Sequence, residues 1–423
     1  MRLSSACAVL FSLSLACGAA ARAQALPEGL QVEGFATLGA YRVDDREAGF
    51  RADQRVPVAG TGGRWRGDGD SQFGLQMQAA LGAETRLVWQ LQAKDDPASR
   101  WRPRSEWLYL GWDFDASSSF KLGRVQAPVF LLSETRPVGF AQLNARPFDT
   151  IYQLNPTTHL DGASLSWTRE LGTDDRLELS LAAGRSFLPL AIGSLDIRRI
   201  AALSLAWRRG DLLLRLGHSG YRGSLNYPSN EALLQQVMSG STACLNCATV
   251  LAERAPFKQL DLKLSSLSMQ WEPASGLRLQ AELALRHGNT VHVPDVRGWY
   301  LLAGWRRGVL TPYAGLGELR FREPPLGLQT APGAPAAAAL FNSTLDLFLQ
   351  APHDRRALQA GLRWDLADKL ALKLQWERQQ HTRNHEIGSN GGSIRYPLAP
   401  PLGPGSHWDG RLQVLTVNLD LVF

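Results

Sequence analysis

The chain has 423 residues, of which 44% are hydrophobic, and its 45 basic and 39 acidic residues give a net charge of +6. This charge is small and dispersed, which argues against a protein that binds nucleic acid. Beyond the N-terminus no run of ~18 apolar residues occurs, so the sequence offers no helical membrane span. The 40 glycines and 13 tryptophans are spread over the whole chain, which argues against long helices.

The N-terminal segment, residues 1–23, has the three parts of a secretory signal peptide. It opens with a basic residue, continues with an apolar stretch at 6–16, and ends in Ala-Arg-Ala, an A-x-A cleavage site. We expect cleavage there, which leaves residues 24–423 as the exported protein and lowers the net charge to +4. The alternative is a lipoprotein signal that ends at Cys17, but Ser14 stands where such a signal favours leucine.

The exported part is dominated by alternating apolar and polar residues, a pattern typical of half-buried β-strands. In 277–286, for example, leucines and one alanine occupy the odd positions, and arginine, glutamine and glutamate fill most of the even ones. We predict sixteen strands, within a range of about 14–18, at residues 30–42, 71–81, 85–94, 105–113, 118–126, 160–169, 176–185, 197–208, 211–221, 260–271, 277–287, 297–306, 310–321, 356–365, 369–379 and 411–423.

A water-soluble sandwich would show the same alternation, but three features favour a membrane barrel. The strands have about 10 residues, the length that a tilted strand needs to cross a bilayer. Their polar faces carry charged residues and glutamine along the full strand, as a wet lumen requires. Short turns alternate with long connections at 43–70, 95–104, 127–159, 186–196, 222–259, 288–296, 322–355 and 380–410. We therefore predict an all-β fold, a closed antiparallel transmembrane β-barrel with short periplasmic turns and long extracellular loops.

Six tryptophans share one position, at the end of a strand just before a short turn. An indole at a membrane interface buries its ring and keeps its N–H in water. We expect these residues to form a periplasmic aromatic girdle: Trp112, Trp167, Trp207, Trp271, Trp305 and Trp364.

The final strand alternates cleanly and ends the chain at Phe423. A C-terminal aromatic residue on such a strand resembles the assembly signal of bacterial outer-membrane proteins. The resemblance implies recognition by the barrel assembly machinery of a Gram-negative bacterium.

One segment, residues 118–162, carries a more specific resemblance. Here Leu122-Gly123-Arg124 runs into Pro128, and Val138-Gly139-Phe140-Ala141 precedes an Arg146-Pro147 step. This resembles the third-loop region of Gram-negative porins, particularly the non-enteric porins related to phosphate-selective porins. A tandem basic ladder of the kind that phosphate selectivity needs is missing from the sequence.

In such porins the third loop folds into the barrel and narrows it, so the resemblance implies that 127–159 forms the constriction. Its apolar run at 129–132 would need a wall to pack on. Charges across a narrow gap set ion preference. Candidate residues on this loop are Glu134, Arg136, Arg146 and Asp149, and candidates on the lumen face of the strands are Arg86, Lys94, Arg176, Arg215, Arg278, Arg286, Arg363 and Lys373, with Glu178, Glu282, Glu377 and Asp420. The basic excess predicts a weak anion preference.

Two cysteines remain after cleavage, Cys244 and Cys247, in a long connection. A redox CxxC would need a thioredoxin-like setting and a zinc site would need a second pair, so an exposed structural disulfide is the preferred interpretation. We predict no metal site and no cofactor.

We therefore predict an outer-membrane porin, a passive diffusion channel for small hydrophilic solutes and ions, and not an enzyme. Two alternatives stay open: a substrate-specific channel, and a barrel-type enzyme, for which no Ser-His-acid set can be found. Expected partners are outer-membrane lipid and lipopolysaccharide, with a homotrimer as the habit of the porins that the chain resembles.

Overall fold

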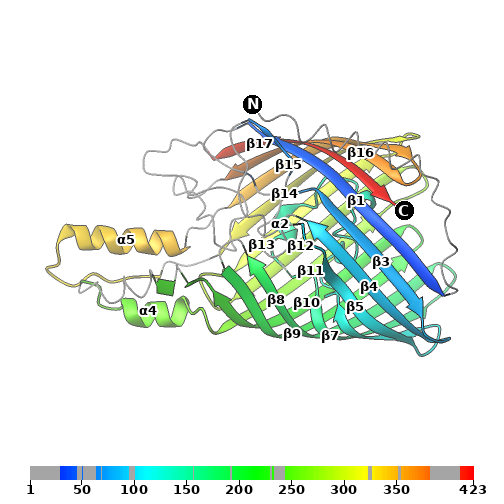
Figure 1. The fold of residues 1–423 in the computed structure, drawn as a ribbon. Helices are drawn as coiled ribbons and strands as arrows, with labels where there is room; N and C mark the ends of the chain where they lie inside the picture. Colours follow the sequence, from blue (N-terminus) through cyan, green and yellow to red (C-terminus); the bar gives the residue numbers. More distant parts are fainter. Residues whose placement is uncertain are drawn as a thin grey trace.

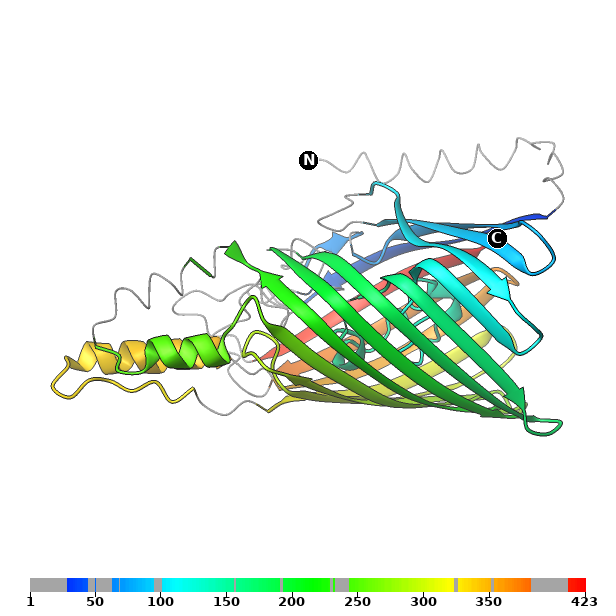
Figure 2. The ribbon, with the colours of Figure 1, turned by 90° about the horizontal axis from the view of Figure 1, so that it is seen from below.

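The structure, a computed structural model, is a closed β-barrel with two helices projecting from one end (Figures 1 and 2). It describes residues 29–44, 50, 63–67, 69–94, 101–155, 157–190, 193–228, 231–232, 243–322, 326–350, 354–381 and 410–423. The expected signal peptide, residues 1–23, lies outside the described residues. Within the described residues, no helix is long and apolar enough to span a membrane.

All sixteen predicted strands are present in the described part of the chain, and each pairs antiparallel with its neighbours. Their bounds are β1 (Leu30–Val43), β3 (Gln72–Ala80), β4 (Thr85–Lys94), β5 (Arg104–Asp113), β6 (Ser118–Val125), β7 (Leu160–Glu170), β8 (Asp175–Leu190), β9 (Gly193–Arg209), β10 (Leu212–Asn226), β11 (Leu260–Trp271), β12 (Leu277–Gly288), β13 (Val296–Trp305), β14 (Leu310–Phe321), β15 (Arg355–Ala367), β16 (Leu370–His381) and β17 (Arg411–Val422). A two-residue strand, β2 (Trp65–Arg66), adds to one edge of β1.

The barrel closes where the first strand meets the last. β1 pairs with β17 from Phe35↔Val422 to Val43↔Val414, and its N-terminal half pairs with β3. The backbones of Gly34 and Phe423 exchange two hydrogen bonds, at 2.9 and 3.0 Å. Closure satisfies the backbone groups of both edge strands, which lipid cannot do.

One predicted long connection, 186–196, is wrong. β8 runs to Leu190 and β9 begins at Gly193, so these strands extend several residues beyond the predicted ends. The extension is stable because its inward side chains keep packing: Leu188 and Leu195 belong to the same buried cluster as Leu225 at the end of β10. The other seven predicted long connections separate strands whose described ends lie at the opposite end of the barrel from the short turns.

The alternation of each strand separates a polar interior from an apolar exterior. On β12, Leu283 and Leu285 are 38% and 50% exposed on the outer face, whereas Glu282 and Arg286 are 2% and 4% exposed on the inner face. The eleven predicted lumen charges on the strands, together with Asp420, follow the same inward parity, and the six girdle tryptophans follow the outward parity beside the short turns. The side chains thus leave an apolar wall for lipid and a polar lumen.

Two long connections form a lobe at the extracellular end (Figures 1 and 2). The β10–β11 connection contains α4 (Cys247–Arg254), and the β14–β15 connection contains α5 (Ala336–Gln350). A bridge between Cys244 and Thr330 joins the two connections. Cys244 and Cys247 form a disulfide with a Cα–Cα distance of 5.6 Å, and Cys247 is buried in the lobe rather than exposed.

We expect Gly34→Ala to weaken the closing seam. The ring of Phe423 covers Gly34 from β17, and a Cβ at Gly34 would lie 2.1 Å from that ring. The ring also stacks on Phe73 at a centroid distance of 6.2 Å, and losing such an aromatic contact costs about 1 kcal/mol. The folded barrel should therefore unfold at a lower temperature, measured by its mobility shift on SDS gels after heating.

Gly220→Ala is the matched control, because Gly220 also lies on an outward strand position but a Cβ there meets nothing within 4 Å. Equal unfolding temperatures for the two variants would show that the Phe423 ring does not stabilise the seam.

Candidate functional site

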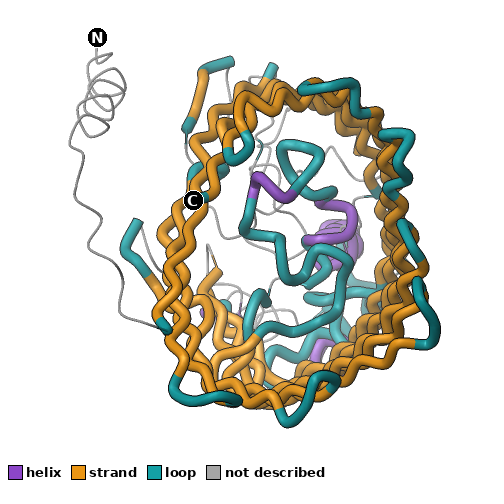
Figure 3. The backbone as a smooth tube through the Cα atoms, turned by 90° about the vertical axis from the view of Figure 1, so that its right-hand side faces the viewer, coloured by secondary structure: helices purple, strands orange, loops and turns teal. Residues whose placement is uncertain are grey.

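The long β6–β7 connection, residues 126–159, lies inside the barrel (Figure 3). It contains the short helices η1 (Gly139–Ala141) and α2 (Asp149–Tyr152). Its apolar side chains pack against the barrel wall: Phe148 stacks on Tyr300 of β13 at 4.8 Å, and Tyr152 lies against the same ring. We call this segment the inner loop.

Polar side chains of the wall fix the first half of the inner loop. Arg215 of β10 donates a hydrogen bond to the Phe130 carbonyl at 3.1 Å. The Glu282 carboxylate of β12 accepts one from the Leu131 amide at 2.5 Å. Both side chains are less than 10% exposed. These two lumen charges therefore bind loop backbone rather than face open water.

The second half of the loop is held by two cations of the neighbouring strands. Lys373 of β16 donates to the carbonyls of Gly139 at 2.6 Å and Asn144 at 3.1 Å. Arg363 of β15 donates to the carbonyls of Phe140 at 2.6 Å and Gln142 at 2.8 Å. These donors satisfy loop carbonyls that point toward the wall.

Lys373 has a second partner deep in the barrel. Its ammonium lies 3.0 Å from a carboxylate oxygen of Asp420 on β17, and both side chains are fully buried. Thr37 of β1 donates to the same carboxylate at 2.6 Å. The pair thus connects the strands at the closing seam to the loop that lies on them.

Two glycines let the loop approach the wall closely. A Cβ at Gly217 of β10 would lie 2.1 Å from the Val129 carbonyl, and a Cβ at Gly298 of β13 would lie 2.1 Å from the Thr150 carbonyl. Any other residue at these positions would push the loop toward the lumen.

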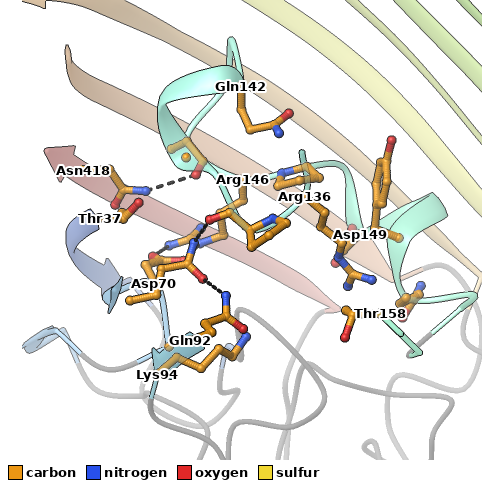
Figure 4. Close-up of a pocket in the computed structure, with 18 of the residues that line it drawn as sticks. Thr37, Asp70, Gln92, Lys94, Arg136, Gln142, Arg146, Asp149, Thr158 and Asn418 are labelled. Atoms are coloured by element: carbon orange, nitrogen blue, oxygen red, sulfur yellow. Dashed lines mark hydrogen bonds and ion pairs between the residues drawn. The ribbon is translucent and has the colours of Figure 1, made fainter. Parts of the chain in front are cut away.

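A cavity of about 120 Å³ remains between the inner loop and the opposite wall, and we call it the channel gap (Figure 4). Strands β1, β3 and β4, the residues just before β3, and Glu106 of β5 form one side; the loop forms the other. The residues that line it are Thr37, Gly69, Asp70, Gln72, Gln92, Lys94, Glu106, Arg136, Pro137, Gly139, Gln142, Ala145, Arg146, Pro147, Asp149, Tyr152, Gln153, Thr158 and Asn418.

An ion pair between Arg146 and Asp70 crosses this gap at one edge. The guanidinium donates through two nitrogens to the two carboxylate oxygens, both at 2.5 Å, in the bidentate geometry that arginine favours. Burial alone would lower the pKa of Arg146, but the Asp70 and Glu377 carboxylates raise it overall. Arg146 is therefore charged and fixes the loop tip to the wall.

The other three candidate charges of the inner loop have different partners or surroundings from Arg146. Asp149 pairs with Arg355 of β15 at 3.0 Å, and Arg136 donates to the Asn155 carbonyl at 3.2 Å while facing the gap. Glu134 is exposed and does not line the gap. Three of the four candidate constriction residues thus line the gap.

The remaining lumen charges have other surroundings. Arg86 pairs with Asp113 of β5, Arg278 lies 3.8 Å from Glu272, and Arg286 donates to the Pro294 carbonyl at 3.2 Å. Arg176 and Glu178 line a second cavity of about 210 Å³ on the inner face near the short turns. Glu377 accepts hydrogen bonds from three glutamines, Gln359, Gln375 and Gln379.

Sequence patterns missed several residues that line the gap or pair with its lining. Asp70 lies in a connection where period two gives no signal, and Arg355 lies at the start of a strand whose predicted bound began one residue later. Glu106 lies at a β-bulge opposite Gln90 and Leu91, so simple alternation does not fix its direction. Among the described residues, no group of three metal-ligating side chains comes together.

The comparisons with known proteins bear on the fold. No family model and no curated protein matches this chain. Solved structures match it along nearly its whole length, at low sequence identity. OmpF of Salmonella typhi, solved in complex with daunomycin, has a TM-score of 0.55 at 11% identity, over 93% of this chain and 97% of that one.

Two further structures are similar to the same extent. The anion-selective porin from Comamonas acidovorans has a TM-score of 0.52 at 13% identity, over 93% of this chain and 99% of that one. OmpT of Vibrio cholerae has a TM-score of 0.50 at 10% identity, over 94% and 99%. At such identities the likeness concerns the fold, and the fold of this chain is a porin-like outer-membrane barrel.

Proposed function

We propose that the protein is a passive diffusion channel for small hydrophilic solutes and ions in the outer membrane of a Gram-negative bacterium. The observation that carries this proposal is the inner loop, which packs on the barrel wall and leaves a polar gap lined by residues of β1, β3, β4 and β17. A barrel of sixteen strands would otherwise enclose a wide aqueous channel. The loop therefore sets the size of what passes.

The protein is also proposed to have a weak anion preference. The lining of the gap holds the cations Lys94, Arg136 and Arg146 and the carboxylates Asp70, Glu106 and Asp149. Behind the lining, Arg355 pairs with Asp149 and Glu377 lies 3.9 Å from Arg146, so cations and carboxylates are equal in number. The proposed preference therefore rests on the excess of basic residues on the lumen faces of the strands, because charge in a narrow, partly desolvated channel acts on passing ions more strongly than in bulk water.

Further features of the proposal rest on the sequence. The chain would be exported by its signal peptide, recognised by the barrel assembly machinery through the strand that ends at Phe423, and related to non-enteric porins. The six girdle tryptophans would lie at the periplasmic interface of the bilayer. Assembly as a homotrimer is proposed on the resemblance to porins alone.

We expect deletion of residues 133–146 to raise single-channel conductance in planar bilayers by roughly twofold or more, because the lumen of a sixteen-stranded barrel is wider than the gap that the loop leaves. Deletion of residues 336–350, which form α5 in the outer lobe, is the control of similar length. It should leave conductance unchanged. If the two deletions change conductance equally, the inner loop does not form the constriction.

We expect Lys94→Glu with Arg136→Glu to shift the reversal potential in a KCl gradient toward cation selectivity. Both side chains line the gap, so the substitution gives its balanced lining a negative excess. Arg146 is left in place because a glutamate there would face Asp70 and Glu377 and would disturb the loop.

Arg306→Glu with Arg307→Glu is the matched control, since these exposed arginines lie in the short β13–β14 turn, away from the gap. The same change in net charge there should move the reversal potential much less. A shift of equal size in both variants would mean that the overall charge of the channel, and not the gap, sets ion preference.

We expect Cys244→Ser with Cys247→Ser to leave conductance and ion preference unchanged. The disulfide lies in the extracellular lobe and shares no residue with the gap. Its loss should instead make the α4 segment more sensitive to added protease, measured by digestion of the folded protein. A changed conductance in the correctly inserted variant would place the lobe on the permeation path.

A further inference from the structure

Four arginines project outward from adjacent strands near the extracellular end of the barrel. They are Arg297 of β13, Arg320 of β14, Arg356 of β15 and Arg378 of β16. Their neighbours in sequence are buried on the inner face, which fixes the outward direction: Val296, Phe321 and Ala357 are each 5% exposed or less. Each arginine lies within four residues of the extracellular end of its strand.

Arginine side chains at these outward positions lower the stability of the folded barrel unless their charges contact water or an anion. Arginine on the lipid face of a barrel destabilises it most at the middle of the bilayer and least near the interface. The strand ends place these four residues at the interface, where lipid headgroups lie.

The arginines also crowd one another. Arg297 and Arg320 are directly opposite in the β13–β14 register, an arrangement that is unfavourable for like charges. One carboxylate, Glu318, accepts hydrogen bonds from Arg320 at 3.0 Å and from Arg356 at 2.9 Å. Asp354, which accepts a hydrogen bond from the Phe321 amide at the end of β14, acts on Arg320 as a second carboxylate. Two carboxylates do not balance four arginines, so the cluster keeps a positive excess that suits an anionic partner.

The cluster borders an outward-facing cavity of about 490 Å³, which we call the arginine groove. Its lining includes Arg320, Arg356 and Arg378 at the extracellular end. Leu316 lies four positions from Arg320 and Leu358 two positions from Arg356, both toward the middle of the barrel, and they are 46% and 44% exposed on the same outer face. The groove is thus cationic where headgroups lie and apolar where acyl chains lie.

We propose that the arginine groove binds a lipid of the outer leaflet through the phosphate groups of its headgroup. Arginine matches phosphate oxygens with two parallel N–H donors, and basic pockets on membrane proteins hold anionic headgroups in this way. The acyl chains lie over Leu316 and Leu358. This lipid site is on the outside of the barrel, so the proposal is independent of the proposed channel function.

The test measures lipid binding to the purified full-length barrel in detergent by native mass spectrometry. The probes are a bisphosphorylated lipid A, the same lipid after enzymatic removal of its phosphates, and inorganic phosphate as a competitor. We compare the wild type with Arg320→Gln/Arg378→Gln and with the single variant Arg378→Gln, which removes one charge and leaves the Glu318 pairs intact. Arg306→Gln/Arg307→Gln, at the short-turn end, removes the same charge as the double variant.

We expect the double variant to bind the phosphorylated lipid roughly tenfold or more weakly than wild type, because each lost charge-assisted hydrogen bond weakens binding by about that factor. The affinity of the single variant for the phosphorylated lipid should lie between those of wild type and the double variant. The short-turn control should bind the lipid as tightly as wild type does. Wild type should bind the phosphorylated lipid more tightly than the dephosphorylated lipid by a similar factor. Millimolar phosphate should not displace the bound phosphorylated lipid.

Equal binding of the two lipids by wild type would overturn the proposal, as would unchanged binding by both groove variants. Displacement by millimolar phosphate would also overturn it, since the groove would then be a site for the free anion. Equal weakening in the short-turn control would assign the effect to net charge. Normal heat resistance on SDS gels and normal conductance of the variants exclude misfolding as the cause.

Discussion

The structure depends on one constraint, that a backbone in lipid must pair all of its N–H and C=O groups. A sheet with sixteen strands meets that constraint only when its first and last strands join, which β1 and β17 do over nine residue pairs. Closure in turn fixes which face of every strand is inside. A polar interior and an apolar exterior follow from the same alternation, because a shift of one residue would turn every leucine of a strand into the lumen.

A second demand arises inside the barrel. The inner loop carries carbonyl and amide groups away from water, and they need partners. The wall supplies them as Arg215, Arg363 and Lys373 for carbonyls and Glu282 for an amide. The sequence predicts these side chains as charges that face the open lumen, but in the structure they bind the backbone of the inner loop. The charge that a passing ion meets is therefore set by a smaller group, chiefly Lys94, Arg136 and the Arg146–Asp70 pair.

Much of the fold could be predicted from the sequence because period-two alternation is a local property. It located all sixteen strands and the inward direction of the predicted lumen charges. It failed at 186–196, where two strands continue because Leu188 and Leu195 join the buried cluster that contains Leu225 of β10. No local pattern shows that a strand end will be covered by a segment distant in sequence.

The gap was harder to predict, because it is made by cross-barrel pairs. The resemblance to porin third loops named Arg136, Arg146 and Asp149, which line the gap, and Glu134, which does not. Their partners Asp70 and Arg355 are 76 and more than 200 residues away from them in the chain, and only the closed register brings them together. Arg215 and Lys373 had the correct direction in the prediction, but their partners are backbone carbonyls, which a sequence does not reveal.

The anchoring of the inner loop also has a consequence for the order of folding. The inner loop follows β6 in the chain. Asp70 and Gln72, which precede the loop, already offer it partners, but other partners lie on β10, β12, β15, β16 and β17. The complete set of donors and acceptors that holds the loop is therefore in place only after the second half of the chain has paired. Lys373 contacts both the loop and Asp420 of the final strand, so its ammonium reaches all its partners only in the closed ring. The full set of contacts that seats the loop therefore requires the closed ring.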